Sequence, residues 1–343
     1  MVRSSTPKGN SFVKMFYYYY AHPGMAGAVA IGLLAMAPSA VLGQSKDFPN
    51  RPVKLIVPFA PGSATDISGR FFGNQLAGEI GQPVIIENRP GADGSIGIMA
   101  AKNSPADGYT HVVAGWTNLT VNPVVMKDMP YDPVKDFKPI SGLTRSMLGV
   151  TVSGASSIKS LDELVAAAKK SPKRLDFGTF SAGYQLAMEW LANTTGVRFN
   201  HVPYKSGATI HTDLMGNQIS ATVDAMSALG PQVRSGKLRV LAVSGDARHP
   251  EFPDIPTVKE SGYPEYSIYG WSAIYTRAET PEDITGKLAE AMQKVMASPA
   301  AQEYRKKVGS EFLAGPPAAM RKFQLDQHQN FRRVAEAAGI RAE

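Results

Sequence analysis

The sequence has 343 residues, of which 43% are hydrophobic and 19% charged, and its net charge is +7. This composition is typical of a globular protein, and the length is enough for two α/β lobes. The chain contains no cysteine, which excludes a disulfide framework, a cysteine nucleophile and a thiolate metal site. The positive charges are spread along the sequence without a basic run that interleaves with aromatic residues, so nucleic acid is not an expected partner.

The first 43 residues differ in character from the rest of the chain. Their charged residues are Arg3, Lys8 and Lys14, and an apolar run over 26–37 is followed by small residues up to Gly43. This pattern is typical of a secretory signal peptide, with Met15 as an alternative start. We therefore expect residues 1–43 to be removed, and the mature protein to be periplasmic and soluble, since no cysteine offers a lipid anchor.

Apolar runs and helical patterns then alternate along the chain. We expect strands at 53–57, 84–87 and 111–114, with helices at 70–80 and 95–102 between them. Short apolar strands separated by helices predict βαβ units and a parallel sheet.

The alternation resumes after residue 150. Ser160 and Glu163 have the spacing of a capping box and open a predicted helix that runs to Lys170. Further strands are expected at 175–179, 201–204, 219–223 and 238–243, with helices at 185–194, 209–215 and 231–235. From Thr280, a suitable N-cap before Pro281, the pattern is helical to near the end.

Two segments, 141–150 and 263–275, lead between the two halves of this pattern. We expect a first lobe formed by 44–146 and 267–343 and a second lobe formed by 147–266. Two such connections can act as a hinge between lobes.

The segment after the first strand predicts an anion site. Phe59 and Pro61 lead into a turn of small and hydroxyl residues, after which a helix begins. Helix N-termini carry N–H groups without partners and a partial positive charge, so they favour carboxylate or phosphate. The candidates are Gly62, Ser63, Thr65 and Asp66. The alternative is an ordinary helix cap, with Ser63 or Thr65 as the N-cap and Asp66 ordering the loop.

A second turn of the same kind follows the strand at 175–179. Its candidate ligand-binding residues are Thr179, Ser181, Ala182, Gly183 and Tyr184. One such turn is weak evidence, but two turns, one in each expected lobe, could enclose a ligand between two sets of backbone donors. Open α/β sheets bind ligands at the carboxyl ends of their strands.

Other candidates lie at strand ends. Trp116, Thr117 and Asn118 follow the third strand, and Tyr204, Asp224 and Ala225 lie at strand ends of the second lobe. Each has a structural alternative: the aromatic rings could pack in the core, and the polar side chains could order turns.

The sequence shows no catalytic constellation. The six histidines lack metal-binding spacing, and there is no nucleophile elbow, P-loop or dinucleotide fingerprint. We therefore expect no metal, no cofactor and no enzymatic activity. The rival is an α/β hydrolase using Ser63 or Ser181, for which no base is apparent.

With these residues in view, the chain resembles the tripartite tricarboxylate transporter substrate-binding proteins, also called the Bug family. The resemblance covers nearly all of the chain after the signal segment. It rests on many short motifs in order: Val57-Pro-Phe59, Thr65-Asp66, Asn88-Arg-Pro-Gly91, Ala106-Asp-Gly-Tyr-Thr110, Tyr131-Asp-Pro133, Lys135-Asp-Phe137, His201-Val-Pro-Tyr-Lys205, Gly236-Lys-Leu-Arg239, Asp254-Ile-Pro-Thr-Val258 and Glu260-Ser-Gly262.

The resemblance implies the two-lobed periplasmic-binding-protein fold of type II, the Venus flytrap, with two hinge crossings. It implies a monomeric receptor for a small carboxylate, such as a di- or tricarboxylate, an aromatic carboxylate or an acidic amino acid. It further implies delivery to integral membrane transporter subunits; a periplasmic sensor for a signalling partner is the alternative. Two departures stand out: the family usually has paired glycines at Gly62 and Ser63, and a glycine at Asp93, where this chain adds an acid near the cleft.

Overall fold

The computed structural model describes residues 48–313, 315–337 and 339–340. The expected signal peptide, residues 1–43, lies outside the described residues. Within them, no helix combines the length and the apolar character needed to cross a membrane.

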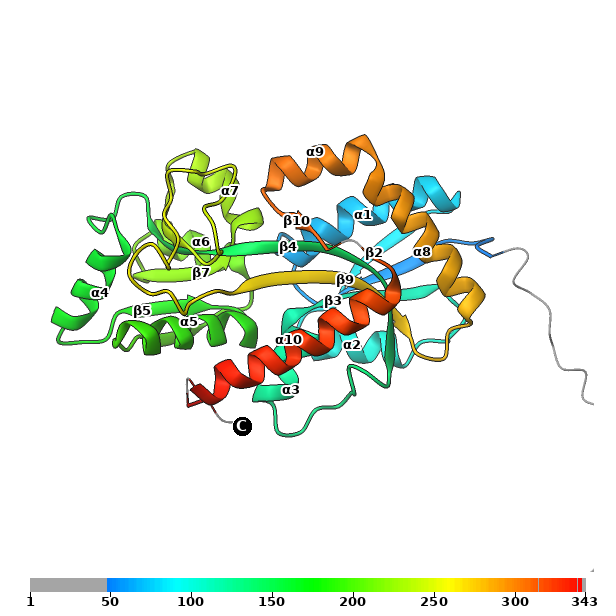
Figure 1. The fold of residues 1–343 in the computed structure, drawn as a ribbon, viewed down its shortest axis with the longest axis horizontal. Coiled ribbons are helices and arrows are strands. Elements are labelled where there is room, and N and C mark those ends of the chain that lie inside the picture. Colours follow the sequence, from blue (N-terminus) through cyan, green and yellow to red (C-terminus); the bar gives the residue numbers. More distant parts are fainter. Residues whose placement is uncertain (1–47, 314, 338, 341–343) are drawn as a thin grey trace, which may run out of the picture. The chain divides into compact units, whose positions relative to one another are not determined.

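The first part of the chain forms βαβ units (Figure 1). In order, its elements are β1 (Val53–Val57), α1 (Ala64–Ile80), β2 (Val84–Asn88), the 3₁₀ turn η1 (Ala92–Gly94), α2 (Ser95–Lys102), β3 (Thr110–Gly115), the π-helical turn η2 (Thr117–Val121) and α3 (Asn122–Val125).

A long strand leads into the second group of elements. These are β4 (Phe137–Ser153), α4 (Leu161–Lys170), β5 (Asp176–Thr179), α5 (Ala182–Thr195), β6 (Asn200–Pro203), α6 (Gly207–Met215), β7 (Ala221–Ala225), α7 (Met226–Arg234) and β8 (Leu238–Val243). The chain returns through β9 (Tyr269–Arg277) and ends with α8 (Glu282–Ala297), α9 (Pro299–Val308), β10 (Glu311–Phe312) and α10 (Pro317–Ala337).

The strands join in the order β2-β1-β3-β9-β4-β7-β5-β6, and β8 and β10 also pair with β4. β1 is parallel to β2 and β3, and β5 is parallel to β6 and β7, as the βαβ pattern predicts. The prediction of a parallel sheet is wrong for β4, which pairs antiparallel with β7, β8, β9 and β10. The reason is that the crossing segments are themselves strands, and they run against their neighbours.

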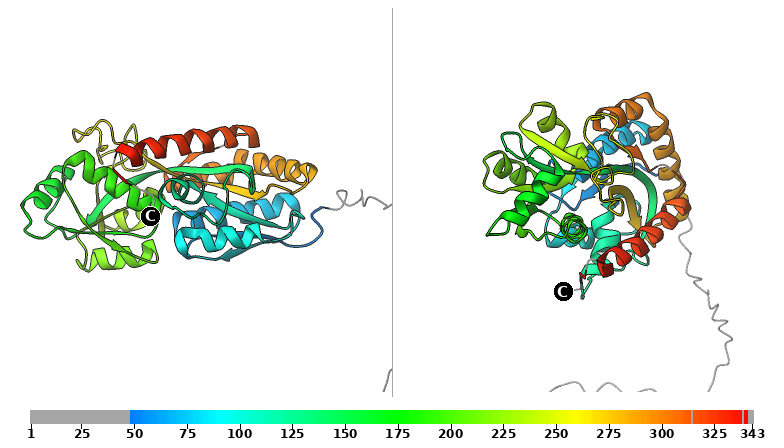
Figure 2. Two further views of the ribbon diagram at one scale, coloured as in Figure 1. Left: turned by 90° about the horizontal axis from the view of Figure 1, so that it is seen from below. Right: turned by 60° about the vertical axis from the view of Figure 1, so that its left-hand side comes forward.

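The two crossing strands run side by side through both halves of the fold (Figure 1). Their pairing extends from Phe137 opposite Arg277 to Met147 opposite Tyr269. Helix α10 lies over this pair (Figure 2): Arg321 donates to the carbonyl of Phe137, and Tyr275 donates to Gln324 at 3.1 Å.

Helices cover both faces of each half of the sheet. Leu55 and Val57 pack with α1 and α8, whereas Ile56, between them, packs with α2. Alternate residues of a strand point to opposite faces, so β1 is buried on both sides. In the other half, α4 and α5 pack on one face and α6 and α7 on the other.

Most element boundaries follow local signals. β1, α2 and β8 have the predicted bounds, and Ser160 caps α4 by accepting from the N–H of Glu163 at 3.2 Å. The predicted N-cap of α8 is wrong by one residue. Pro281 takes that position, and the Thr280 hydroxyl instead lies 2.9 Å from that of Thr276.

Candidate ligand-binding site

The turn between β1 and α1 is held in shape by the carboxylate of Asp66, which is 3% exposed. Its Oδ2 accepts from the N–H of Gly62 at 2.9 Å and from Arg70 Nε at 3.1 Å, and its Oδ1 accepts from Asn88 Nδ2 at 2.8 Å. Burial opposes ionisation, but the hydrogen bonds from Arg70, Asn88 and Gly62 together lower the pKa of Asp66. Asp66 is therefore an internal charge that orders the turn.

The same turn presents a helix N-terminus. Ser63 is the N-cap of α1 and accepts from the N–H of Asp66 at 3.2 Å. Thr65 lies half-buried in the first turn of the helix, and Gly62 has a φ of +83°, which favours glycine. The positive end of the α1 dipole therefore points to the exposed segment that contains Pro61 and Gly62.

The second turn lies between β5 and α5. Thr179 ends the strand and its Oγ1 lies 2.7 Å from His201 Nε2, while Ser181 is the N-cap of α5. The Ser181 side chain makes no capping hydrogen bond to α5 and lies instead 3.4 Å from Thr117 Oγ1. Burial lowers the pKa of His201, and the charge of Asp93 opposes this effect.

The second turn is in contact with the segment that follows β3. The rings of Trp116 and Tyr184 meet edge to face at 5.1 Å between centroids. A Cβ on Gly183 would lie 2.5 Å from Thr117 Oγ1 and 3.0 Å from the Trp116 ring. Because only a glycine allows this approach, Gly183 is a close-packing position between the two parts of the chain.

A second contact joins the turns through aromatic rings. Phe59, at the start of the first turn, meets Phe180 edge to face at 6.4 Å between ring centroids. Phe180 in turn packs against Tyr184 at 4.6 Å. Aromatic side chains thus form a wall that reaches from one turn to the other.

Asp93 also lies at the second turn, although it is not among the residues predicted from the sequence to bind a ligand. Its Oδ1 accepts from the N–H of Ala182, the first residue of α5, at 2.9 Å. Asn118 is fully buried and donates through Nδ2 to the Asp93 carbonyl at 2.8 Å. The departure from the family's usual glycine at this position was the signal available in the sequence.

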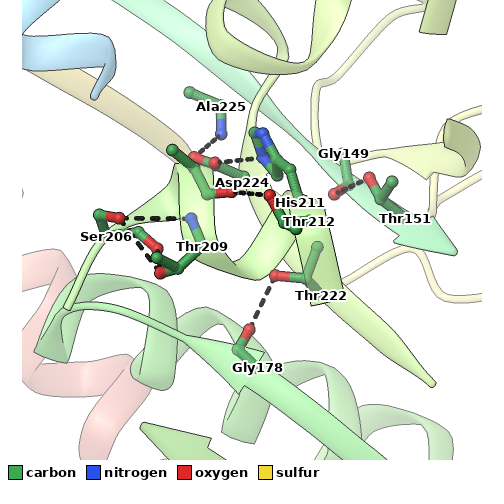
Figure 3. A network of polar contacts seen from close by, with 11 residues as sticks. Gly149, Thr151, Gly178, Ser206, Thr209, His211, Thr212, Thr222, Asp224 and Ala225 are labelled. Carbon is green, nitrogen blue, oxygen red and sulfur yellow. Dashed lines mark hydrogen bonds and ion pairs between the residues drawn. The ribbon is translucent and has the colours of Figure 1, made fainter. Parts of the chain in front are cut away.

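Tyr184, Asp224 and Ala225 lie together behind the second turn. Asp224 Oδ2 is 3.0 Å from His211 Nε2, and its Oδ1 accepts from the N–H of Ala225 at 2.7 Å (Figure 3). Burial, followed by the charge of Asp224 and its hydrogen bond, raises the pKa of Tyr184 well above the ordinary value. These residues therefore form a buried polar support for the N-terminus of α5.

Tyr204 is placed differently from the other candidates. It follows β6, and its hydroxyl donates to Asp213 of α6 at 2.7 Å. Burial and the Asp213 carboxylate raise the pKa of Tyr204 to about 12. The hydroxyl therefore points to α6, and the ring lies beside Gly178 of β5.

Elsewhere, a cavity of about 340 Å³ lies between the 123–134 segment and α10, away from both turns. In the part of the chain that the structure describes, no group of three or more His, Cys, Asp or Glu side chains could hold a metal ion. Helix N-termini and hydroxyl groups in general favour small anions, and each of the two turns brings these features together.

Comparison with known proteins identifies relatives over most of the chain. The family described as "Tripartite tricarboxylate transporter family receptor" matches residues 69–340. BugT of Bordetella pertussis is 33% identical over 297 residues, which cover 86% of this chain and 91% of BugT.

Solved structures agree in fold. The structure of "R. palustris Rpa4515 with adipate" superposes with a TM-score of 0.84 at 30% identity, covering 87% of this chain and all of that chain. The periplasmic binding protein BugD gives a TM-score of 0.82 at 28% identity, covering 86% of this chain and all of BugD. The fold is therefore the two-lobed fold of periplasmic binding proteins, and the chain belongs to the tripartite tricarboxylate transporter receptor family, the Bug family of solute-binding proteins.

Proposed function

We propose that the protein is a monomeric periplasmic receptor that closes two lobes on a small organic carboxylate and delivers it to a tripartite tricarboxylate-type membrane transporter. The observation that carries the proposal is the juxtaposition of two strand–turn–helix N-termini, 61–66 and 179–184, linked by the Phe59–Phe180 contact. We assign lobe 1 to 44–146 and 267–343 and lobe 2 to 147–266, with β4 and β9 as the crossings.

The chemistry of the turns favours a carboxylate ligand. Helix N-termini favour negative charge, and the hydroxyl groups of Ser63, Thr65 and Ser181 can donate to carboxylate oxygens. The related protein Rpa4515, at 30% identity, is described with adipate. We propose that the site is formed by Phe59, Pro61, Gly62, Ser63, Thr65, Asp66, Trp116, Thr117, Asn118, Thr179, Ser181, Ala182, Gly183, Tyr184, Tyr204, Asp224 and Ala225. Of these, Asp66, Tyr184, Tyr204, Asp224 and Ala225 shape and support the two turns, and the others face the ligand.

Binding without chemical conversion is the activity that we propose. Ser63 Oγ accepts from the N–H of Asp66, and Ser181 Oγ has the Thr117 hydroxyl as its partner. Neither hydrogen bond supplies the base that a serine nucleophile needs.

Titration calorimetry on the mature chain tests the proposal. The panel contains di- and tricarboxylates, aromatic carboxylates and acidic amino acids, and circular dichroism verifies that the protein is folded. We expect at least one class to bind, because a ligand that contacts both lobes stabilises the closed form. A folded protein that binds no acid in the panel contradicts the proposed ligand class. Chemical turnover of a bound acid would instead support the hydrolase.

A further inference from the structure

We propose that Asp93 determines specificity in this site: it supplies the carboxylate at the N-terminus of α5, so the ligand brings a hydrogen-bond donor or a cationic group to this end. The inference rests on the proposed function and sharpens its ligand class. The favoured ligand carries one carboxylate, held by the turn at 61–66, and an amino group directed at Asp93, instead of two carboxylates.

The backbone around Asp93 is built to present its side chain. Ala92 and Asp93 have φ values of +46° and +50°, in the left-handed region that residues other than glycine rarely occupy. Such a conformation persists where its surroundings impose it. Here Asn118 and Asn122 both donate through Nδ2 to the carbonyl oxygen of Asp93, at 2.8 and 3.2 Å.

The carboxylate of Asp93 occupies the position where an anion would bind. Its Oδ1 accepts from the N–H of Ala182 at 2.9 Å, although the two residues are 89 positions apart in the chain. Ala182 is the first residue of the 14-residue helix α5, where the N–H groups lack helical acceptors and the dipole is positive. The Ser181 side chain does not cap this helix, so Asp93 takes over the role of acceptor.

The carboxylate of Asp93 forms no ion pair among the described residues, and although its charge acts on His201, burial lowers the pKa of that imidazole. None of the ion pairs in the described ranges of the chain includes Asp93. Its half-buried side chain has a single hydrogen bond among the described residues, from Ala182 to Oδ1, and Oδ2 has none. A ligand ammonium or amide can therefore donate to this carboxylate.

A second ligand carboxylate is disfavoured at the same place for two reasons. It would compete with Asp93 for the Ala182 N–H, and it would bring a second negative charge next to the half-buried Asp93 carboxylate. Specificity of this kind comes from a repulsive element as much as from an attractive one. A glycine at this position, as is usual in the family, has neither effect.

Calorimetry with matched ligand pairs tests the inference. Each pair shares one spacer and differs in the terminal group: succinate and β-alanine, glutarate and γ-aminobutyrate, adipate and δ-aminovalerate, and isophthalate and meta-aminobenzoate. For the pair that binds best, we expect the wild type to prefer the amino acid about tenfold or more. Asp93→Asn keeps an oxygen for the Ala182 N–H but removes the charge, and we expect it to abolish or reverse this preference. Asp93→Gly restores the usual glycine and should favour the dicarboxylate most.

Asp128→Asn is the matched control, since Asp128 is exposed in the loop before β4, and it should leave the preference unchanged. A wild type that binds dicarboxylates at least as well as amino acids, with Asp93→Asn giving the same ratio, would overturn the role of Asp93 and leave the receptor intact. A folded wild type that binds no member of any pair overturns the carboxylate receptor and this inference together.

Discussion

Asn88 Nδ2 lies 2.8 Å from Asp66 Oδ1 and 3.0 Å from the carbonyl oxygen of Phe59. Asn88, the last residue of β2, therefore connects the two ends of the turn that follows β1 through these hydrogen bonds. The conformation of the turn depends on Asp66 as an acceptor. The first prediction concerns this residue.

Asp66→Asn should lower the free energy of unfolding at pH 7 by about 2 kcal/mol, because a buried amide replaces a carboxylate that accepts charge-assisted hydrogen bonds. The pKa of Asp66 is lowered from its ordinary value of 3.8, so its contribution to stability is present above that pH. The contribution is lost as the pH falls through the folded-state pKa. Urea unfolding of both proteins from pH 7 to pH 3 should show the difference shrinking below about pH 4. A difference that is constant with pH would mean that the charge is not responsible.

Substitutions at Ser63 and Thr65 should distinguish a helix-capping role from a ligand-binding role. Ser63→Ala removes the N-cap acceptor of α1 and should lower stability by about 1 kcal/mol. Thr65→Val removes a hydroxyl that does not cap the helix, and should weaken ligand binding with little loss of stability. Thermal unfolding and calorimetry with the best acid of the panel measure the two effects. Unchanged affinity with a lowered melting temperature for Thr65→Val would assign Thr65 a structural role.

Gly183→Ala should weaken ligand binding about tenfold, because the added Cβ would lie 2.5 Å from Thr117 Oγ1 and 3.0 Å from the Trp116 ring. The hydroxyl can rotate away, but the packed indole ring cannot, so the second turn is pushed away from the segment that follows β3. With ligand present, small-angle scattering should show a larger radius of gyration for Gly183→Ala than for the wild type. Gly286→Ala in α8, with no atom within 4 Å, is the control and should raise stability by about 1 kcal/mol. Equal affinities for both variants would refute the close-packing role of Gly183.

Asp224→Asn should destabilise the protein by about 1–3 kcal/mol, because it disturbs a buried acceptor shared by His211 and the N–H of Ala225. Thr212→Val, on the exposed side of the same helix as His211, removes only a hydrogen bond to Ala208 within α6 and should change stability by about 0.5 kcal/mol or less. Urea unfolding compares the two. If both variants lost equally little free energy of unfolding, Asp224 would not be required to support the fold.

The sequence predicts elements well where a local signal ends them. The run that forms β1 stops at Pro58, and α2 starts after Gly94, which has a positive φ. The sequence predicts the start of α7 five residues late, because Pro231 resembles a first helical residue but lies inside the helix. In α1, the helix begins at Ala64 instead of Arg70, directly after the Ser63 cap.

The features of the structure that the sequence does not show depend on contacts between residues that lie far apart in the chain. The 17-residue strand β4 depends on pairing with β9, more than a hundred residues away, so its continuity has no local signature. The Asp93–Ala182 hydrogen bond likewise arises from packing of the two halves. The sequence could identify both turns as helix N-termini, but not which acceptor one of them already has.

The continuous pairing of β4 with β9 has a mechanical consequence. Two strands joined by a hydrogen-bonded ladder resist sliding along each other, since sliding would break every rung at once. We therefore expect the lobes to rotate by twisting and bending this ribbon, and not by sliding of β4 along β9. The register of this pairing shifts between Pro139 and Ser141 and between Gly142 and Thr144, so we expect the ribbon to bend and twist most easily at these two places.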